Sequence, residues 1–270
     1  MGTINSAFNP TQPEMKANCH FYMEYKPDVT SQTDISLFYQ FQLNEQSKGV
    51  LPIIPDGCID LLFNCDPNAP FSVIATSPKQ RCSYQFKNNS LYFGVRLFPE
   101  QCKLKFRTSM KELIQHQQLP LFDILDLNQS SQELIATLPN FKERILFFIS
   151  LINSKPLDET YDWKLINFCL NKIYTTLGLV NIKDLSIETG YSDRYLRKKF
   201  EEYIGFSPKQ FSQIVRLQHS VQDLLNSHPP LNDLLDHYGF YDQSHFYKGF
   251  KKLMSLTPQE YKFNFFQIEN

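Results

Sequence analysis

The sequence predicts an α+β protein with two domains, a β-rich N-terminal domain that also contains helices and an all-α C-terminal domain. Three observations support this prediction. A chain of 270 residues is long enough for two hydrophobic cores. Residues 18–98 form short aromatic segments that alternate with a period of two, whereas later apolar residues have helical spacing. The last third of the chain repeats one motif after about 50 residues.

The N-terminal part contains seven segments that favour β-strands. Turn signals such as Pro55-Asp56-Gly57 and Asp66-Pro67-Asn68 separate them. Short strands with such turns are typical of a β-sandwich or a small β-barrel. The predicted strands are residues 20–26, 36–43, 50–54, 58–64, 71–76, 81–87 and 91–98.

Aromatic residues are frequent in these strands and allow two interpretations. They line a cavity for a small apolar or aromatic ligand, or they fill a small core. Asp60 lies between Ile59 and Leu61, where we expect it to be a structural hydrogen-bond acceptor. The aromatic residues are Phe38, Tyr39, Phe41, Phe63, Phe86, Tyr92 and Phe93.

The N-terminal part does not favour metal or cofactor chemistry. His20 is its only histidine before His116, whereas a metal-dependent barrel needs a set of histidine and carboxylate ligands. We therefore expect no metal, no cofactor and no catalytic residue. The six cysteines form no C-x-x-C pair and are expected to be reduced, with a redox-sensing pair as the alternative.

Charge and hydropathy limit the partners. The net charge is −1, so positive charge is only local, around residues 194–199 and 248–252. Local clusters suffice for contacts to phosphates and predict moderate non-specific affinity for nucleic acid. No apolar run approaches membrane-spanning length, and we expect a cytoplasmic protein without a membrane partner.

Helical segments follow the predicted strands. Residues 109–115 predict a short helix, and residues 132–153 predict one long helix with enough apolar positions to pack on the barrel and to leave a stripe for a partner helix. Polar residues around Pro156 then predict a linker. The expected boundaries are a β-rich N-terminal domain at 1–153, a linker at 154–162 and a helical C-terminal domain at 163–270.

Each copy of the repeated motif predicts a helix-turn-helix. Gly190-Tyr191-Ser192 matches Gly239-Phe240-Tyr241-Asp242, in which the glycine can take a positive φ at the end of the first helix and the last residue can cap the second. Both copies end in a capping box, at Ser207-Pro208-Lys209-Gln210 and Thr257-Pro258-Gln259-Glu260. Paired units of this kind can place two helices in successive turns of the major groove.

Residues 207–226 predict one rigid amphipathic helix that joins the two units. Such a connector fixes the separation of the units, and successive major-groove faces are about 34 Å apart. One chain is then expected to recognise an asymmetric DNA site. Arg216 lies on the connector, and we expect it to form a structural ion pair rather than a base contact.

The second helix of each unit carries the candidate DNA contacts. In the first unit Arg194, Arg197 and Lys198 are predicted to face outward, and arginine is the usual bidentate partner of guanine. Gly249 lies within the second helix of the second unit and either permits a close approach or marks a weaker reader. The outward residues of the second unit are predicted to be Gln243, Ser244, Tyr247, Lys248 and Lys251.

Residues 163–262 resemble the AraC/XylS family of bacterial transcription regulators. The most diagnostic stretch is residues 239–250, with Gly239-Phe240 and Asp242-Gln243-Ser244-His245-Phe246. Gly190-Tyr191-Ser192 and Gly205-Phe206-Ser207-Pro208 also match. Ser186 and Leu235 depart from the usual alanine, and Ser255 from the usual glycine.

The resemblance implies a sequence-specific DNA-binding regulator that acts as an activator, with an operator and RNA polymerase as partners. It implies base contacts from Arg194, Arg197 and Lys198, and from Gln243, Ser244 and Lys248. Residues 51–64 resemble the cupin-like sensor domain of some of these regulators, which agrees with a small-molecule effector. Helices such as those predicted after the strands commonly dimerise members of the family, which implies a homodimer.

Two other classes of protein were weighed. An enzyme with this helix-turn-helix, such as a DNA alkylation-repair protein, needs a four-cysteine zinc cluster or an acceptor cysteine in a dedicated motif, and neither is visible. The other is a structural or ligand-storage barrel whose helical half binds protein, which a demonstration of sequence-selective, salt-dependent DNA binding would exclude.

Overall fold

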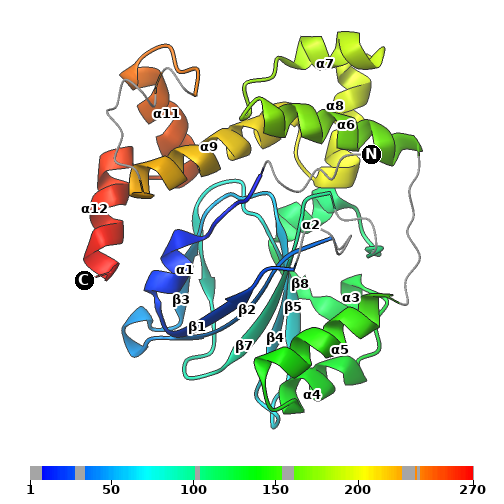
Figure 1. The fold of residues 1–270 in the computed structure, drawn as a ribbon, viewed down its shortest axis with the longest axis vertical. Helices are drawn as coiled ribbons and strands as arrows, with labels where there is room; N and C mark the ends of the chain where they lie inside the picture. The colour runs from blue at the N-terminus through cyan, green and yellow to red at the C-terminus, as the bar shows by residue number, and fades with distance from the viewer. Residues whose placement is uncertain are drawn as a thin grey trace.

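The computed structural model describes residues 8–27, 34–100, 104–153, 161–226, 235 and 238–269. It has a β-rich N-terminal domain and a helical C-terminal domain (Figure 1). Most of the first helix of the second helix-turn-helix unit lies outside the described residues, and so do residues 154–160 of the predicted linker.

An antiparallel sheet of order β1-β2-β7-β4-β5-β8 forms the N-terminal domain, and β3 and β6 pair separately. All seven predicted strands are confirmed, whereas the three-residue β8 was not predicted because it is too short to show a period. The strands are β1 (Cys19–Tyr25), β2 (Ile35–Leu43), β3 (Val50–Ile53), β4 (Ile59–Asn64), β5 (Ser72–Thr76), β6 (Cys82–Gln85), β7 (Tyr92–Leu97) and β8 (Gln118–Pro120).

The aromatic side chains fill two cores, one on each face of the large sheet. Phe38, Phe63 and Phe93 pack on one face against Phe148. Tyr39, Phe41 and Tyr92 belong to the cluster on the other face. A small cavity between Tyr39, Tyr84 and Phe86 measures ≈ 20 Å³, which is room for about one water molecule, and Tyr39 also borders a larger cavity between the domains. The aromatics therefore form packed cores, and Tyr39 among them also lines a cavity.

A buried polar cluster crosses the sheet from β4 to β7. Asp60 accepts hydrogen bonds from the Tyr39 hydroxyl at 2.8 Å and from Arg96 Nε at 3.0 Å. Arg96 Nη1 lies 3.5 Å from Asp56 Oδ2, and the side-chain exposures of Arg96 and Asp56 are 5% and 2%. Burial raises the pKa of Asp60, and the Arg96 guanidinium opposes that rise. The structural role expected for Asp60 is thus confirmed.

Among the described residues, five α-helices and a 3-10 turn complete the N-terminal domain. The single helix predicted for residues 132–153 is wrong, because the chain breaks at Pro139 between two helices. Leu138 has ψ 133°, the extended conformation that a following proline favours. The helices are α1 (Pro13–Ala17), the 3-10 turn η3 (Glu45–Ser47), α2 (Met110–His116), α3 (Leu121–Ile124), α4 (Ser130–Thr137) and α5 (Phe141–Asn153).

Where the structure describes it, the C-terminal domain has the helices and caps predicted for residues 182–226 and from Asp242 onward, and the first helix predicted for the second unit is not tested. The Ser192 hydroxyl accepts a hydrogen bond from the Tyr195 backbone N–H, and Gly190 ends the preceding helix with φ 74°. Ser255, where glycine is usual, also takes a left-handed φ of 60°. The helices are α6 (Tyr161–Thr175), α7 (Ile182–Thr189), α8 (Asp193–Ile204), α9 (Pro208–Asn226), α11 (Gln243–Met254) and α12 (Pro258–Glu269).

The two domains pack closely against one another. Phe8 is 3% exposed, lies in the core of the helical domain and stacks on Tyr174 with 4.9 Å between the ring centroids. Near it, Phe211 of α9 packs on Gly57, where an added Cβ would lie 2.6 Å from Phe211 Cε2. The Tyr174 hydroxyl donates to Glu100 of the N-terminal domain at 2.8 Å.

Glu100 makes folding stability depend on pH. Burial raises the pKa of its carboxyl from 4.5 to about 7, and Asp34 adds to the rise. Glu100 is therefore protonated in the folded chain over a range in which the unfolded chain is charged. Stability should fall as pH rises from about 4.5 to 7, by at most about 3 kcal/mol from this group. Urea unfolding at several pH values should show a smaller decline for Glu100→Gln, and equal declines would contradict the assignment.

Within the described residues no helix is long and apolar enough to cross a membrane, and no cluster of histidine, cysteine and carboxylate side chains is suited to a metal. The five described cysteines are unpaired. Burial raises the pKa of Cys169 to about 11 and that of Cys19 to about 12. Both thiols are therefore weak nucleophiles at neutral pH.

Candidate DNA interface and an interdomain pocket

The first recognition helix, α8, separates an apolar side from a basic one. Leu196 and Phe200 are 1% and 0% exposed and fix the helix to the domain core. Arg194, Arg197 and Lys198 are exposed, as predicted. Because Arg194 and Arg197 are three residues apart on a helix, their side chains can enter the same groove.

Arg197 is held by a carboxylate of its own helix. Its Nε lies 2.9 Å from Glu201 Oε1, and Glu201 Oε2 lies 3.2 Å from Lys111 Nζ of α2. These two cations lower the pKa of the Glu201 carboxyl, and the hydrogen bond from Arg197 is the largest cause. Lys111 can still pair with Glu201 if the Arg197 side chain turns away from it.

The second recognition helix, α11, presents a polar face with less positive charge. Asp242 caps it by accepting a hydrogen bond from the His245 backbone N–H at 2.7 Å. Tyr247 is half-buried against Phe246, so it is less available than predicted. The other predicted contacts, Gln243, Ser244, Lys248 and Lys251, are exposed.

Tyr241 is a candidate contact that the sequence reasoning missed. Its side chain is 94% exposed and lies just before the cap of α11. The signal was present in the spacing of the two copies. From Gly190 to the cap at Ser192 is two residues, whereas from Gly239 to the cap at Asp242 is three. The additional residue of the second turn is Tyr241.

Arg216 connects the two units, and the ion pair that was predicted for it is not found among the described residues. Its Nη2 donates to the Gly178 carbonyl at 3.0 Å, and its guanidinium lies 5.3 Å from the centroid of the Phe240 ring. Burial lowers its pKa. A Cβ at Gly249 would lie 3.7 Å from Phe240, an ordinary contact, so packing within the described chain does not require glycine there.

The connector places the recognition helices at its two ends. In Figure 1, α8 and α11 lie at opposite ends of α9, and the β-sheet lies on the lower side of that helix. The C-terminal end of α8 reaches α2, where an added Cβ at Gly205 would lie 2.5 Å from Ile114 Cγ1. The N-terminal domain therefore contacts α8 at the end opposite its N-terminal residues.

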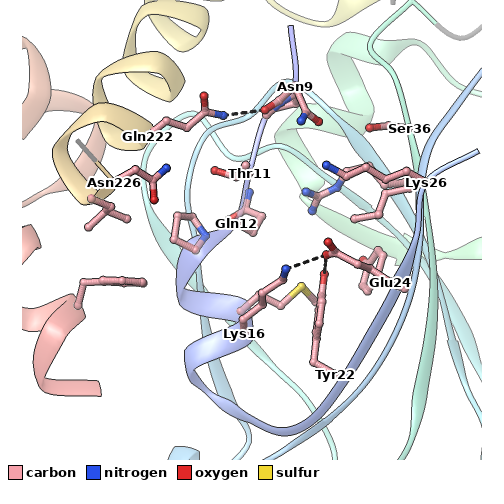
Figure 2. Close-up of a pocket in the computed structure, with 18 of the residues that line it drawn as sticks. Asn9, Thr11, Gln12, Lys16, Tyr22, Glu24, Lys26, Ser36, Gln222 and Asn226 are labelled. Atoms are coloured by element: carbon pink, nitrogen blue, oxygen red, sulfur yellow. Dashed lines mark hydrogen bonds and ion pairs between the residues drawn. The ribbon is translucent and has the colours of Figure 1, made fainter. Parts of the chain in front are cut away.

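A cavity of ≈ 470 Å³ lies between the domains. Its walls come from the segment before α1, from α1, from β1 and β2, and from the ends of α9 and α12. In Figure 2, Gln222 of α9 bonds to the backbone of Asn9 on one side, and Lys16 and Tyr22 both reach Glu24 on the other.

The walls combine apolar surface with an excess of positive charge. Lys16 Nζ lies 3.1 Å from Glu24 Oε2, and Arg96 is balanced by its carboxylates in the sheet. Lys26 has no ion-pair partner among the described residues. The apolar wall residues include Pro10, Pro13, Met15, Leu37, Leu225, Phe265 and Phe266.

Two family models match parts of the chain. Residues 185–263 match a family described as a helix-turn-helix domain, and residues 23–119 match a domain of unknown function. The first range contains α8, α9 and α11 with their turns.

Curated relatives align with the helical part alone. An HTH-type transcriptional regulator of Staphylococcus aureus is 29% identical over 83 residues, which are 31% of this chain and 11% of that protein. The lactose operon transcription activator of Staphylococcus xylosus is 26% identical over 86 residues, 32% of this chain and 31% of that protein. The chain thus spans less than a third of the length of these relatives.

Among solved structures, apo ToxT from Vibrio cholerae, in a variant form, gives a TM-score of 0.43 at 15% identity, over 90% of this chain and 96% of that chain. ToxT bound to an unsaturated fatty acid gives a TM-score of 0.39 at 16% identity, over 91% of this chain and 96% of that chain.

From the family match, the curated relatives and the geometry of the helices, residues 185–263 of this chain form a helix-turn-helix domain of the AraC/XylS type, the DNA-binding domain of a family of transcription regulators.

Proposed function

We propose that this protein is a sequence-specific DNA-binding transcription regulator that reads two adjacent segments of the major groove. One observation carries the proposal. Two capped helices, α8 and α11, lie at opposite ends of one continuous helix, and each buries an apolar stripe while it exposes polar side chains. A rigid connector of this kind suits two readers on one side of a duplex.

In this proposal the first reader supplies most of the sequence selectivity. Arg194 and Arg197 contact bases, since arginine forms two hydrogen bonds to guanine, and Lys198 contacts a base or a phosphate. In the second reader Gln243 contacts adenine, and Ser244 and Lys248 contact bases or phosphates. Tyr241, Tyr247 and Lys251 bind the phosphate backbone beside them.

We further propose that the N-terminal domain regulates DNA binding through a small molecule in the interdomain cavity. The walls favour an organic anion with an apolar body, because Lys16 and Lys26 lie beside apolar side chains from both domains. A ligand that contacts α1 and α12 together changes the balance between arrangements of the two domains. The packed sheet offers much less space, so the effector belongs between the domains and not within the barrel.

The remaining partners are proposed from the family resemblance. The regulator acts as an activator and contacts RNA polymerase. Dimerisation uses α4 and α5, where Leu134 and Leu146 are 44% and 56% exposed. Sedimentation of the wild type and of Leu134→Glu at matched concentrations tests this contact.

DNA selection with the full chain tests the proposed function. A random duplex library is selected at physiological salt, and two information-rich blocks about 10 base pairs apart are expected. The motif should be asymmetric, and its affinity should fall steeply with salt because cations are displaced from phosphates. A chain that enriches no motif at any salt concentration, with or without carboxylate ligands, would refute the proposal.

The effector is tested with matched ligands. Aliphatic and aromatic carboxylates should raise the melting temperature of the full chain more than the alcohols of the same skeleton do. Lys26→Met should reduce the difference between acid and alcohol, because it removes a positive charge from the wall without removing its apolar stem. Equal shifts for acids and alcohols, or an unchanged difference in Lys26→Met, would exclude this anion site.

A further inference from the structure

The second recognition helix is attached to the N-terminal domain by its C-terminal end. The loop between β5 and β6 donates two hydrogen bonds to carbonyls of the last turn of α11. Arg81 N–H bonds to the Leu253 carbonyl at 2.7 Å, and Gln80 Nε2 bonds to the Lys252 carbonyl at 2.9 Å. The last carbonyls of a helix have no partner within it, so the loop acts as a cap supplied by the other domain.

The same loop residue reaches the wall of the interdomain cavity. The Arg81 guanidinium binds both oxygens of Glu14, at 2.6 Å from Nη2 and at 3.0 Å from Nε. Glu14 belongs to α1 and is 3% exposed, and its neighbours Met15 and Lys16 line the cavity. The backbone of Arg81 thus bonds to α11, and its side chain bonds to α1, which forms part of the cavity wall.

The opposite wall of the cavity is connected to α11 as well. Phe265 and Phe266 of α12 line the cavity. One helical turn earlier, Tyr261 is 1% exposed and packs on Phe250 of α11 with 6.0 Å between the centroids. A ligand that moves α1 relative to α12 therefore acts on α11 from two sides.

The two units contact the N-terminal domain in different ways. Phe8 is inserted in the core of the first unit, and Gly205 lies against α2 without room for a methyl group. In the second unit, Ile54 of the N-terminal domain is buried in a cluster with Phe246 and Phe250 of α11. The hydrogen bonds from Gln80 and Arg81 add a polar contact at the C-terminal end of α11, beside a cleft of ≈ 550 Å³ that Arg81 and Leu253 line.

We propose that Arg81 is a positioning residue that couples the interdomain cavity to α11, so that the effector controls reading of the second half of the DNA site. The first half is read in either ligand state. This inference rests on the proposed function, because it needs two readers. A ligand can shift the equilibrium between two positions of α11 only to the extent that the ligand binds one of these positions more tightly than the other.

The test uses the full chain and three versions of the selected operator: intact, with the first block scrambled, and with the second block scrambled. Arg81→Gln should bind the intact operator and the first-scrambled operator about tenfold more weakly than the wild type, since a charge-assisted pair is lost. Its affinity for the second-scrambled operator should be unchanged, because only α8 reads that DNA. A loss on the intact operator alone or an equal loss on all three would overturn the proposal, and so would no loss.

Two further variants keep the test decisive. Glu14→Gln should reproduce the same pattern and should add nothing to Arg81→Gln, as expected for partners in one interaction. Gln80→Ala should weaken the same two complexes by a few-fold. Its matched control is Lys79→Ala, an exposed neighbour without a hydrogen bond to α11 among the described residues, which should bind all three operators like the wild type. If Gln80→Ala behaves like its control while both arginine-pair variants unfold, the proposal fails.

Failure of the inference can be told from failure of the proposed function. A wild-type chain that ignores both scrambled blocks has no readers, and the proposed function falls. A wild-type chain that loses affinity with either block scrambled confirms two readers, and only the variants then decide the role of Arg81.

Discussion

Replacement of both Arg194 and Arg197 by alanine is expected to lower the affinity for the operator about 100-fold. A bidentate contact between arginine and a base contributes about 1–3 kcal/mol of discrimination, and both side chains lie on the exposed face of α8. We expect a contribution below about 3 kcal/mol from Arg197, because its guanidinium must first break the ion pair with Glu201, in which Nε lies 2.9 Å from Oε1. Fluorescence anisotropy with labelled operator at constant salt measures the loss.

The control for this pair removes the same charge elsewhere. Lys142→Ala with Arg107→Ala takes two cations from the N-terminal domain, outside both recognition helices, and should change operator affinity by less than about threefold. The arginine pair should also lose selectivity between the operator and a scrambled duplex. If affinity for both duplexes falls equally, the arginines contact phosphates and the assignment of α8 as the main reader is wrong.

The largest expected effect on stability comes from Arg96→Met. This change leaves Asp56 and Asp60 buried without their cation, and removal of one partner from a buried ion pair typically costs about 3–5 kcal/mol. In the wild type, Arg96 binds Asp60 at 3.0 Å and lies 3.5 Å from Asp56. Urea unfolding at neutral pH measures the difference in the free energy of unfolding.

The pH dependence of this variant identifies the cause. Without Arg96 the folded-state pKa of Asp60, already raised by burial, rises further, so the variant is least destabilised at acid pH and loses stability as pH rises. The control is Arg107→Met, which breaks an exposed pair with Asp126 and should cost less than about 1 kcal/mol. A loss for Arg96→Met that is the same at pH 4.5 and 7.5 would point to lost packing instead of uncompensated charge.

The sequence predicted those parts of the fold that local chemistry determines. The strands follow from period-two alternation between turn residues, and the helix-turn-helix units follow from capping residues such as Ser192 and Asp242. The break at Pro139 is also local, and the prediction of one long helix gave the apolar period too much weight over the proline. The outward residues of α8 could be predicted because its apolar stripe is unambiguous.

The interdomain features could not be predicted, because they depend on contacts between residues far apart in the chain. Nothing local marks Phe8 as a core residue of the helical domain or Arg81 as a partner of Glu14. The cavity is formed by segments from both ends of the chain. Arg216 was expected to pair with a carboxylate, whereas among the described residues its guanidinium contacts a carbonyl and an aromatic ring.

The insertion of Phe8 has a consequence for the order in which the chain folds during synthesis. Phe8 leaves the ribosome long before Tyr174, Phe211 and His219, the aromatic residues that its ring meets. The β-rich domain can form first, as domains generally do in order from the N-terminus. The segment around Phe8 can then be buried only after the helical domain has been synthesised. A nascent chain that stalls before α9 would leave this aromatic side chain exposed and available to chaperones.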